Sequence, residues 1–165
     1  MSASNATGRR SQIELQVALP EQLALFCELE RDPDTAPYVL PTTLEQHRRA
    51  FAREEIIYLS IYDRGELGGF FILALDSDER SVEFRRIVVA DKGRGTGRRA
   101  INTMETYCRD RLQRSRIWLD VFDFNERGRQ VYSRLGYQLF DQRTYQGKQL
   151  LYYQKELETR SSARA

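Results

Sequence analysis

The sequence contains few of the residues that metal centres and covalent hydrolases need. Its 165 residues include only one histidine, His47, and two cysteines, Cys27 and Cys108. A structural zinc site uses about four Cys or His ligands, so we expect no metal site of that kind. A Ser-His triad would depend on His47 alone, and no Gly-x-Ser-x-Gly motif accompanies it. His47 is flanked by Gln46 and Arg48, which predicts a surface position on its helix.

An excess of one charge and long apolar runs are also missing. Lys plus Arg number 26 and Asp plus Glu number 24, a formal net charge of +2, which argues against a protein that coats nucleic acid or an anionic membrane. No apolar run reaches membrane-spanning length, and residues 1–10 are polar and lack a signal-peptide core. Cys27 and Cys108 lie in helix-like apolar patterns, which predicts reduced, buried thiols in a cytoplasmic protein.

What is present is typical of one globular domain. Hydrophobic residues make up 41% and charged residues 30% of a chain whose length fits a single domain. The polar ends, residues 1–10 and 158–165, are predicted to be flexible tails, because they offer too little apolar surface to offset the entropy of ordering. The folded domain is therefore predicted to cover residues 11–157.

Apolar periodicity predicts a mixed order of strands and helices within this domain. Thr43 and Gln46 form a capping box that marks the start of one helix. The predicted helices are residues 20–32, 43–52, 97–112 and 126–135, and the predicted strands are residues 13–19, 56–62, 67–75, 81–89, 117–121, 137–143 and 150–157. This order predicts an α/β (α+β) fold.

The strand at residues 81–89 changes phase in its middle. Val82 and Phe84 are apolar at even positions, whereas the apolar residues after Arg86 stand at odd positions. One extra residue at the arginine pair, a β-bulge, explains the change and would leave main-chain groups free for a ligand. A strand covered on both faces, with the arginines reaching to an edge, explains it equally well.

A glycine-rich basic loop follows this strand and leads into a helical pattern. Its glycines alternate with basic residues in the run Lys92, Gly93, Arg94, Gly95, Thr96, Gly97, Arg98, Arg99. Glycines let backbone N–H groups approach a ligand, and the start of a helix adds positive potential, so the loop favours a phosphate. The spacing fits neither a Walker loop nor a dinucleotide Gly-x-Gly-x-x-Gly loop. A basic turn without a ligand is equally compatible with this run alone.

A second group of residues lies on the helix at residues 126–135. Asn125 is placed to cap its start and Gly136 to end it. Gly128 costs about 1 kcal/mol relative to alanine inside a helix, so it suggests a close approach by another group. Tyr132 lies one turn further on the same face. In isolation Tyr132 fits a core tyrosine with a satisfied hydroxyl better than a catalytic residue.

Together, these motifs resemble the GNAT superfamily of acyl-CoA-dependent N-acetyltransferases. The family loop Gln/Arg-x-x-Gly-x-Gly/Ala is matched from Lys92 to Gly97, although lysine lacks the fork geometry of arginine. The family's later signature is matched by Asn125, Arg127, Gly128, Tyr132, Gly136 and Tyr137. The resemblance covers residues 13–157 and is closest to the branch related to ribosomal-protein N-terminal acetyltransferases. It implies a mixed, mostly antiparallel central sheet with a bulged fourth strand, flanked by about four helices.

The resemblance also implies acetyl-CoA as co-substrate, no metal, and roles for named residues. Main-chain groups of Ile87, Val88 and Val89 are expected to bind the pantetheine arm and the acetyl carbonyl. The other residues expected to contact the cofactor are Lys92, Gly93, Arg94, Gly95, Thr96, Gly97, Arg98, Asn125 and Gly128. Tyr132 is expected to give a proton to the departing thiolate, and Glu83 to take one from the amine, directly or through water. A solvent-facing Glu83 paired with a neighbouring arginine is at least as good an interpretation.

The expected function is transfer of an acetyl group from acetyl-CoA to a primary amine by direct attack. The amine belongs to a small molecule, a protein N-terminus or a lysine. A catalytically silent CoA-binding domain is the first alternative, and a phosphate- or RNA-binding module is the second, which the near-neutral charge supports little. The expected partners are acyl-CoA and the acceptor, without nucleic acid or membrane, and the family allows a homodimer through its final strands.

Overall fold

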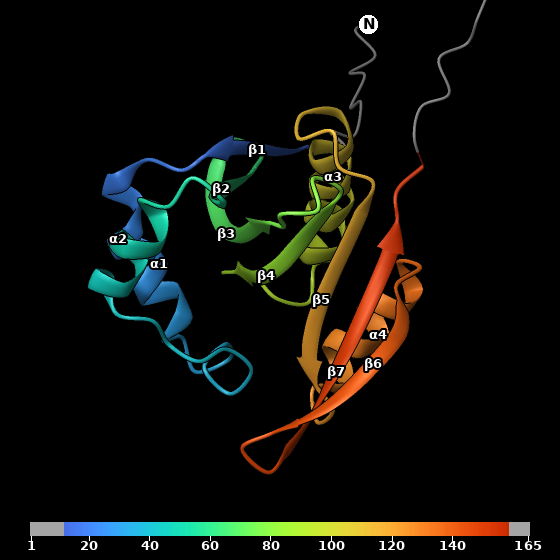
Figure 1. The fold of residues 1–165 in the computed structure, drawn as a ribbon. Coiled ribbons are helices and arrows are strands. Elements are labelled where there is room, and N and C mark those ends of the chain that lie inside the picture. Colours follow the sequence, from blue (N-terminus) through green and yellow to red (C-terminus); the bar gives the residue numbers. More distant parts are fainter. Residues whose placement is uncertain (1–11, 159–165) are drawn as a thin grey trace, which may run out of the picture.

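The computed structural model describes residues 12–158, and its elements follow the predicted order (Figure 1). They are β1 (Ile13–Val17), a 3-10 turn (Pro20–Gln22), α1 (Leu23–Glu30), α2 (Leu44–Phe51), β2 (Ile56–Asp63), β3 (Glu66–Leu75), β4 (Ser81–Val89), α3 (Thr96–Asp110), β5 (Arg116–Phe122), α4 (Glu126–Arg134), β6 (Gln138–Tyr145) and β7 (Lys148–Glu156). The predicted tails, apart from Glu158, lie outside the described residues, and the domain boundaries stay predictions. No helix within residues 12–158 combines the length and apolar character that crossing a bilayer needs.

Seven strands form one sheet in the order β1-β2-β3-β4-β5-β7-β6. All neighbouring strands are antiparallel except β4 and β5, which are parallel. Helices α1 and α2 cover one face of the N-terminal half, while α3 and α4 pack on the opposite face (Figure 1). The predicted mixed, mostly antiparallel sheet with four helices is confirmed.

Two cores lie on opposite faces of the sheet because side chains alternate along a strand. On β3, Phe71 packs with α3 and Phe70 packs with α1. The predicted burial of both thiols is confirmed, with Cys108 under α3 and Cys27 under α1. Burial raises the pKa of Cys108 to about 12, so neither its position nor its ionisation suits a nucleophile.

The predicted bulge is present in β4. Ile72 on β3 pairs with Arg86 and Leu73 pairs with Phe84, so Arg85 is the extra residue. Just before the bulge, the pairing of β4 with β5 stops, since it covers only Ser81–Glu83. The two parallel strands then diverge toward their carboxyl ends, which opens the sheet between them (Figure 1).

Candidate active site

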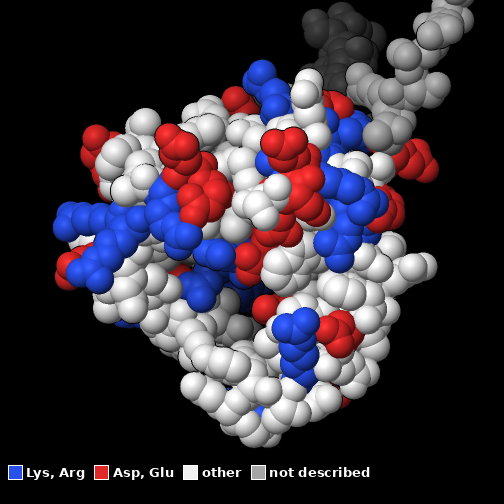
Figure 2. All heavy atoms as spheres, in the orientation of Figure 1, with Lys and Arg blue, Asp and Glu red and all other residues white. Residues whose placement is uncertain are grey.

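A cavity of about 780 Å³ lies where β4 and β5 diverge. Its walls come from β4 around the bulge, the loop before α3 with the start of that helix, the end of β5, α4, the β6–β7 hairpin, and the segment between α1 and α2. The space-filling view shows this face hollowed near its centre, with basic and acidic side chains both close to the opening (Figure 2). The cavity therefore collects residues from six separate parts of the chain.

One end of the cavity is formed by the glycine-rich loop and the start of α3. Gly93 and Gly95 have φ values of 86° and 75°, which side chains rarely adopt, so the turn itself requires these two glycines. Gly97 has an ordinary φ, and a Cβ placed on it would meet no atom within 4 Å. The space in front of the first turn is thus open, and its N–H groups, with Lys92 and Arg98 in the lining, suit an anion.

Most of the predicted loop residues line this cavity, but Arg94 does not. Its guanidinium lies 3.6 Å from the Asp91 carboxylate and faces a separate depression on the surface. The Lys92 ammonium instead donates a hydrogen bond to the hydroxyl of Thr35, in the segment between α1 and α2. Lys92 therefore joins the loop to the opposite wall.

On β4 the structure separates the three residues predicted to bind the pantetheine arm. Ile87 and Val89 line the cavity, whereas Val88 is buried against α1. A Cβ on Gly69 of β3 would stand 2.1 Å from the Val88 carbonyl oxygen, so that carbonyl faces β3. Because main-chain groups alternate between strand edges, Ile87 and Val89 direct theirs toward the gap. The structure thus favours these two over Val88 as main-chain ligands.

Asn125 and Gly128 both line the cavity, and they also contact each other. The Asn125 side chain caps α4 by accepting a hydrogen bond of 3.0 Å from the Gly128 N–H. A Cβ on Gly128 would stand 2.9 Å from the Asn125 amide nitrogen. The close approach that Gly128 predicted is therefore made by the cap itself. Gly136 follows α4 with a φ of 94°, as predicted.

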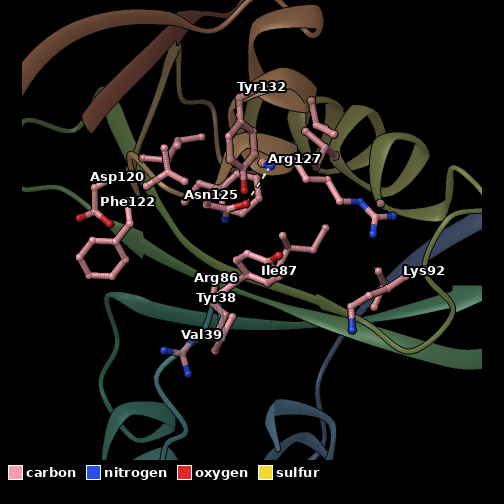
Figure 3. A pocket seen from close by; sticks show the side chains of 18 of the residues that line it. Tyr38, Val39, Arg86, Ile87, Lys92, Asp120, Phe122, Asn125, Arg127 and Tyr132 are labelled. Carbon is pink, nitrogen blue, oxygen red and sulfur yellow. Dashed lines mark hydrogen bonds between the residues drawn. The ribbon is translucent and has the colours of Figure 1, made fainter. Parts of the chain in front are cut away.

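Tyr132 projects its hydroxyl from α4 into the cavity (Figure 3). Its ring packs edge-on against Phe84 and Tyr137, with centroid distances of 5.9 and 6.0 Å. Burial, and then the charge of Asp120, raise the pKa of Tyr132 to about 12. The phenol therefore keeps its proton at neutral pH and can donate a hydrogen bond into the cavity.

The two carboxylates nearest this region differ in their surroundings. Glu83 accepts a hydrogen bond of 2.8 Å from Arg85 and is not among the lining residues. Asp120 on β5 does line the cavity, and no side chain within residues 12–158 forms an ion pair or hydrogen bond with its carboxylate. Burial, and then the charge of Glu83, raise the pKa of Asp120. Asp120 is thus placed to accept a proton or to bind a cation.

Sequence reasoning missed Asp120, although a signal was present. Asp120 is the acidic residue in a short strand whose other face carries Ile117, Leu119 and Val121, all buried. An acid at the carboxyl end of a parallel strand stands where open sheets hold ligands. The position of Asp120 in its strand was therefore as good a reason to propose a catalytic base as the position of Glu83 in the strand before the bulge.

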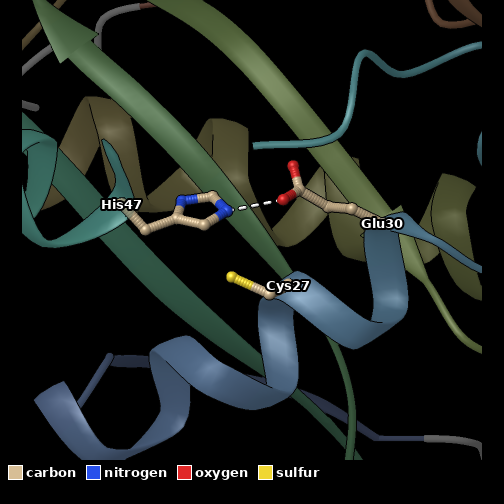
Figure 4. Close-up of side chains that lie close together, drawn as sticks. All are labelled: Cys27, Glu30 and His47. Atoms are coloured by element: carbon tan, nitrogen blue, oxygen red, sulfur yellow. Dashed lines mark hydrogen bonds and ion pairs between the residues drawn. The ribbon is translucent and has the colours of Figure 1, made fainter. Parts of the chain in front are cut away.

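A buried polar network adjoins the cavity at Arg86, and it overturns the prediction for His47. His47 is fully buried, and one ring nitrogen lies 2.5 Å from the Glu30 carboxylate (Figure 4). The other ring nitrogen lies 2.7 Å from the Tyr58 hydroxyl. Glu30 also pairs with Arg86, which donates a hydrogen bond of 2.8 Å to the Thr42 hydroxyl. The surface prediction was wrong because Gln46 and Arg48 point outward while His47 faces the sheet.

The same network holds the one set of metal-ligand side chains grouped within residues 12–158. Ligand atoms of Cys27, Glu30 and His47 lie within 4.8 Å of one another. Both ring nitrogens of His47 are engaged, however, and the charge of Glu30 is paired with Arg86. Glu30 and His47 are therefore committed to a hydrogen-bond network, which leaves no open set of ligands beside Cys27.

Comparisons with known proteins agree with this geometry. A scan against protein families matches residues 22–137 to the acetyltransferase (GNAT) family. A search of curated proteins finds no significant match.

Several solved structures share the fold. The spermidine N-acetyltransferase from Vibrio cholerae in complex with CoA and spermine has a TM-score of 0.76 at 18% identity, over 88% of this chain and 96% of that one. A chimera of this enzyme, SpeG, and hSSAT has a TM-score of 0.75 at 18% identity, over 89% and 96% of the two chains. A domain from Methanocaldococcus jannaschii has a TM-score of 0.75 at 15% identity, over 90% and 100%. At such identities the similarity shows a shared fold.

Proposed function

The chain belongs to the acetyltransferase (GNAT) family, and from this membership we propose how its cavity transfers an acetyl group from acetyl-CoA to a small cationic amine. Acetyl-CoA-dependent N-acetyl transfer is the activity of the family, and the predicted membership is confirmed. The branch related to ribosomal-protein N-terminal acetyltransferases gains no support from the similar structures, which include spermidine N-acetyltransferases. The proposal therefore concerns the roles of residues and the kind of acceptor.

One observation carries the proposal: the two ends of the cavity offer different polar groups. At the α3 end, the cofactor end, it offers helix N–H groups with Lys92 and Arg98, which suit the pyrophosphate of CoA. At the other end, the acceptor end, it offers the carboxylate of Asp120, which suits an ammonium group. Tyr132 faces the space between the two ends (Figure 3). An anionic donor and a cationic acceptor would thus meet beside the Tyr132 hydroxyl.

The acceptor must lose a proton before it attacks. A lysine-type ammonium has a pKa of about 10.4, so a base near the nitrogen is needed at neutral pH. Asp120 takes this proton, and its raised pKa makes it a better base than an ordinary aspartate. The free electron pair of the nitrogen then forms the C–N bond with the thioester carbonyl, and main-chain N–H groups at Ile87 or Val89 stabilise the oxyanion. No covalent bond to the protein is formed.

Collapse of this intermediate breaks the C–S bond and leaves negative charge on sulfur. Tyr132 donates a hydrogen bond to that charge. With a pKa of about 12 against roughly 8.5 for a thiol, full proton transfer from Tyr132 is uphill. Tyr132 therefore stabilises the thiolate. As the intermediate collapses, the nitrogen loses its second proton, which goes to the sulfur, while the first proton leaves Asp120 for the solvent. This makes the general-acid role predicted for Tyr132 a hydrogen-bonding role.

The test is thermal unfolding with and without acetyl-CoA, followed by an assay of CoA thiol release with an amine. Acetyl-CoA at 100 times its Kd should add about 2.7 kcal/mol of stability, a rise of roughly 5–10 °C in the midpoint for a chain of this size. NAD at the same concentration is the control. The absence of a shift with acetyl-CoA would overturn the proposal.

The variant Tyr132→Phe separates an enzyme from a silent CoA-binding domain. It keeps the ring packing against Phe84 and removes only the hydroxyl. We expect kcat to fall about tenfold or more while the acetyl-CoA shift persists. Unchanged kcat would remove Tyr132 from the reaction.

The proposal includes a homodimer formed through the final strands and no role for nucleic acid. Strand β6 is the edge of the sheet and exposes Leu139 and Phe140 by 46% and 43%. Unpaired edges of this kind favour pairing with another chain. Light scattering gives the solution mass, and a monomer that keeps full activity would exclude the dimer. The net charge of +2 speaks against nucleic acid.

A further inference from the structure

We propose that the acceptor is a primary amine with a single positive charge on an aromatic body, because one unpaired carboxylate, Asp120, stands among aromatic walls behind a basic rim. The inference rests on the proposed function and names the substrate class of the same site. It separates this chain from a polyamine acetyltransferase, although the similar structures include such enzymes.

The first step is the number of charges at the acceptor end. Two arginines line it, but both are already paired: Arg85 with Glu83 at 2.8 Å, and Arg86 with the buried Glu30. Each pair is close to neutral, so the field at this end is dominated by Asp120. A single carboxylate matches a single ammonium group.

The second step is the position of the other acidic lining residues. They are Asp34 and Asp91, and both belong to the cofactor end. Asp91 lies 3.6 Å from Arg94 and directly precedes Lys92, while Asp34 directly precedes Thr35, which accepts the hydrogen bond from Lys92. Glu83, whose charge acts on Asp120, lies outside the lining and is paired with Arg85. Among the described lining residues, a polyamine would therefore find no second carboxylate beside Asp120.

The third step is the wall around Asp120. The rest of the acceptor end is largely aromatic, with Tyr38, Phe84, Phe122, Tyr145 and Tyr152 in its lining. Tyr38 and Tyr145 are 48% and 50% exposed, although large apolar side chains at the surface are usually covered when they cluster. Aromatic rings pack well against another ring, in stacked or edge-to-face geometry. These walls suit a planar apolar body.

The fourth step is the charge at the rim. The Lys148 ammonium lies 5.7 and 5.6 Å from the ring centres of Phe122 and Phe124, and the Arg143 guanidinium lies 5.1 Å from that of Tyr152. Arg143 is paired with Asp141, but Lys148 has no ion pair within the described part of the chain. Cations already lie over these rings, so a second ammonium on the acceptor would be repelled.

The experiment compares three acceptors at saturating acetyl-CoA: 2-phenylethylamine, n-butylamine and spermidine. We expect kcat/KM to be highest for 2-phenylethylamine and to exceed that for spermidine by about tenfold or more. Preference for spermidine, or acetylation of neither 2-phenylethylamine nor n-butylamine, would overturn the inference while a thermal shift with acetyl-CoA kept the proposed function. Loss of that shift would instead remove the proposed function.

A pair of variants tests the rim. Lys148→Glu adds a second carboxylate at the mouth and should raise kcat/KM for spermidine about fivefold without raising that for 2-phenylethylamine. Arg111→Glu is the matched control, because it makes the same charge change at the far end of α3. Equal effects of the two variants on spermidine would show that only net charge matters and would contradict a role for the rim.

Discussion

The two ends of the cavity differ in the groups that form them: main-chain groups at one end and side chains at the other. The cofactor end is mostly backbone: two glycines with positive φ, the open first turn of α3, and main-chain groups of Ile87 and Val89. The acceptor end is mostly side chains, contributed by α1–α2, β4, β5 and the β6–β7 hairpin. A backbone site binds what every family member binds, whereas a side-chain site changes with each substitution. The comparison implies that the two ends can be disabled separately.

Asp120→Asn should have the largest effect on the rate of acetyl transfer, and it should act on the acceptor end without changing the cofactor end. Loss of the base should lower kcat/KM for the amine by about 10²–10⁴. The acetyl-CoA Kd should stay within about twofold, because Asp120 lies away from the glycine loop. The fold should not lose stability, since burial raises the pKa of Asp120 and so disfavours its charged form. A large rise in the acetyl-CoA Kd would show that the two ends are coupled.

Glu30→Gln should lower the free energy of unfolding by breaking the buried pair of Glu30 with Arg86, which lines the acceptor end. The change keeps a hydrogen-bond partner for His47 but leaves the charge of Arg86 unpaired beside a fully buried position. Breaking a buried pair in this way costs about 3–5 kcal/mol, measured by urea unfolding. We also expect the amine KM to rise more than the acetyl-CoA KM.

Glu28→Gln on the same helix is the control for that variant. Glu28 is exposed, so its replacement should change stability by less than about 0.5 kcal/mol. Similar losses for both variants would mean that the negative charge of α1, and not the pair with Arg86, stabilises the fold.

The difference between the two ends also explains what could be predicted from the sequence. The bulge, the glycine loop and the Asn125 cap depend on local patterns, and the structure contains all three. The position of His47 depends on which helix face meets the sheet, and its polar neighbours gave the wrong answer. The pairing of Glu83 with a neighbouring arginine was one of two interpretations of the sequence, and the structure has that pair, with Arg85. That Asp120 stays unpaired depends on contacts between strands, which local patterns do not define.

Gly97→Ala should affect the cofactor end alone. Its Cβ would enter open space and its φ is ordinary, so the fold should gain up to about 1 kcal/mol from the better helix former. The same methyl group would occupy the space in front of the first turn, and the acetyl-CoA Kd should rise about tenfold. Calorimetric titration measures the Kd, and thermal unfolding without ligand measures the stability. A variant that is more stable and binds acetyl-CoA as tightly would place the pyrophosphate elsewhere.

Glu83→Gln should have the smallest effect and decides between the two carboxylates. If Asp120 is the base, Glu83 acts on it only through charge, by raising the pKa of Asp120. Removing that charge, and freeing Arg85, both lower the pKa of Asp120, so the acidic limb of the pH profile of kcat/KM should move to lower pH. Activity near neutral pH should fall by less than about tenfold, since the base becomes weaker.

If Glu83 itself is the base, the acidic limb of the pH profile should disappear and kcat/KM should fall by about 10² or more. Glu54→Gln, at an exposed site before β2, should move neither quantity, and the contrast with it isolates what the carboxylate beside Asp120 contributes.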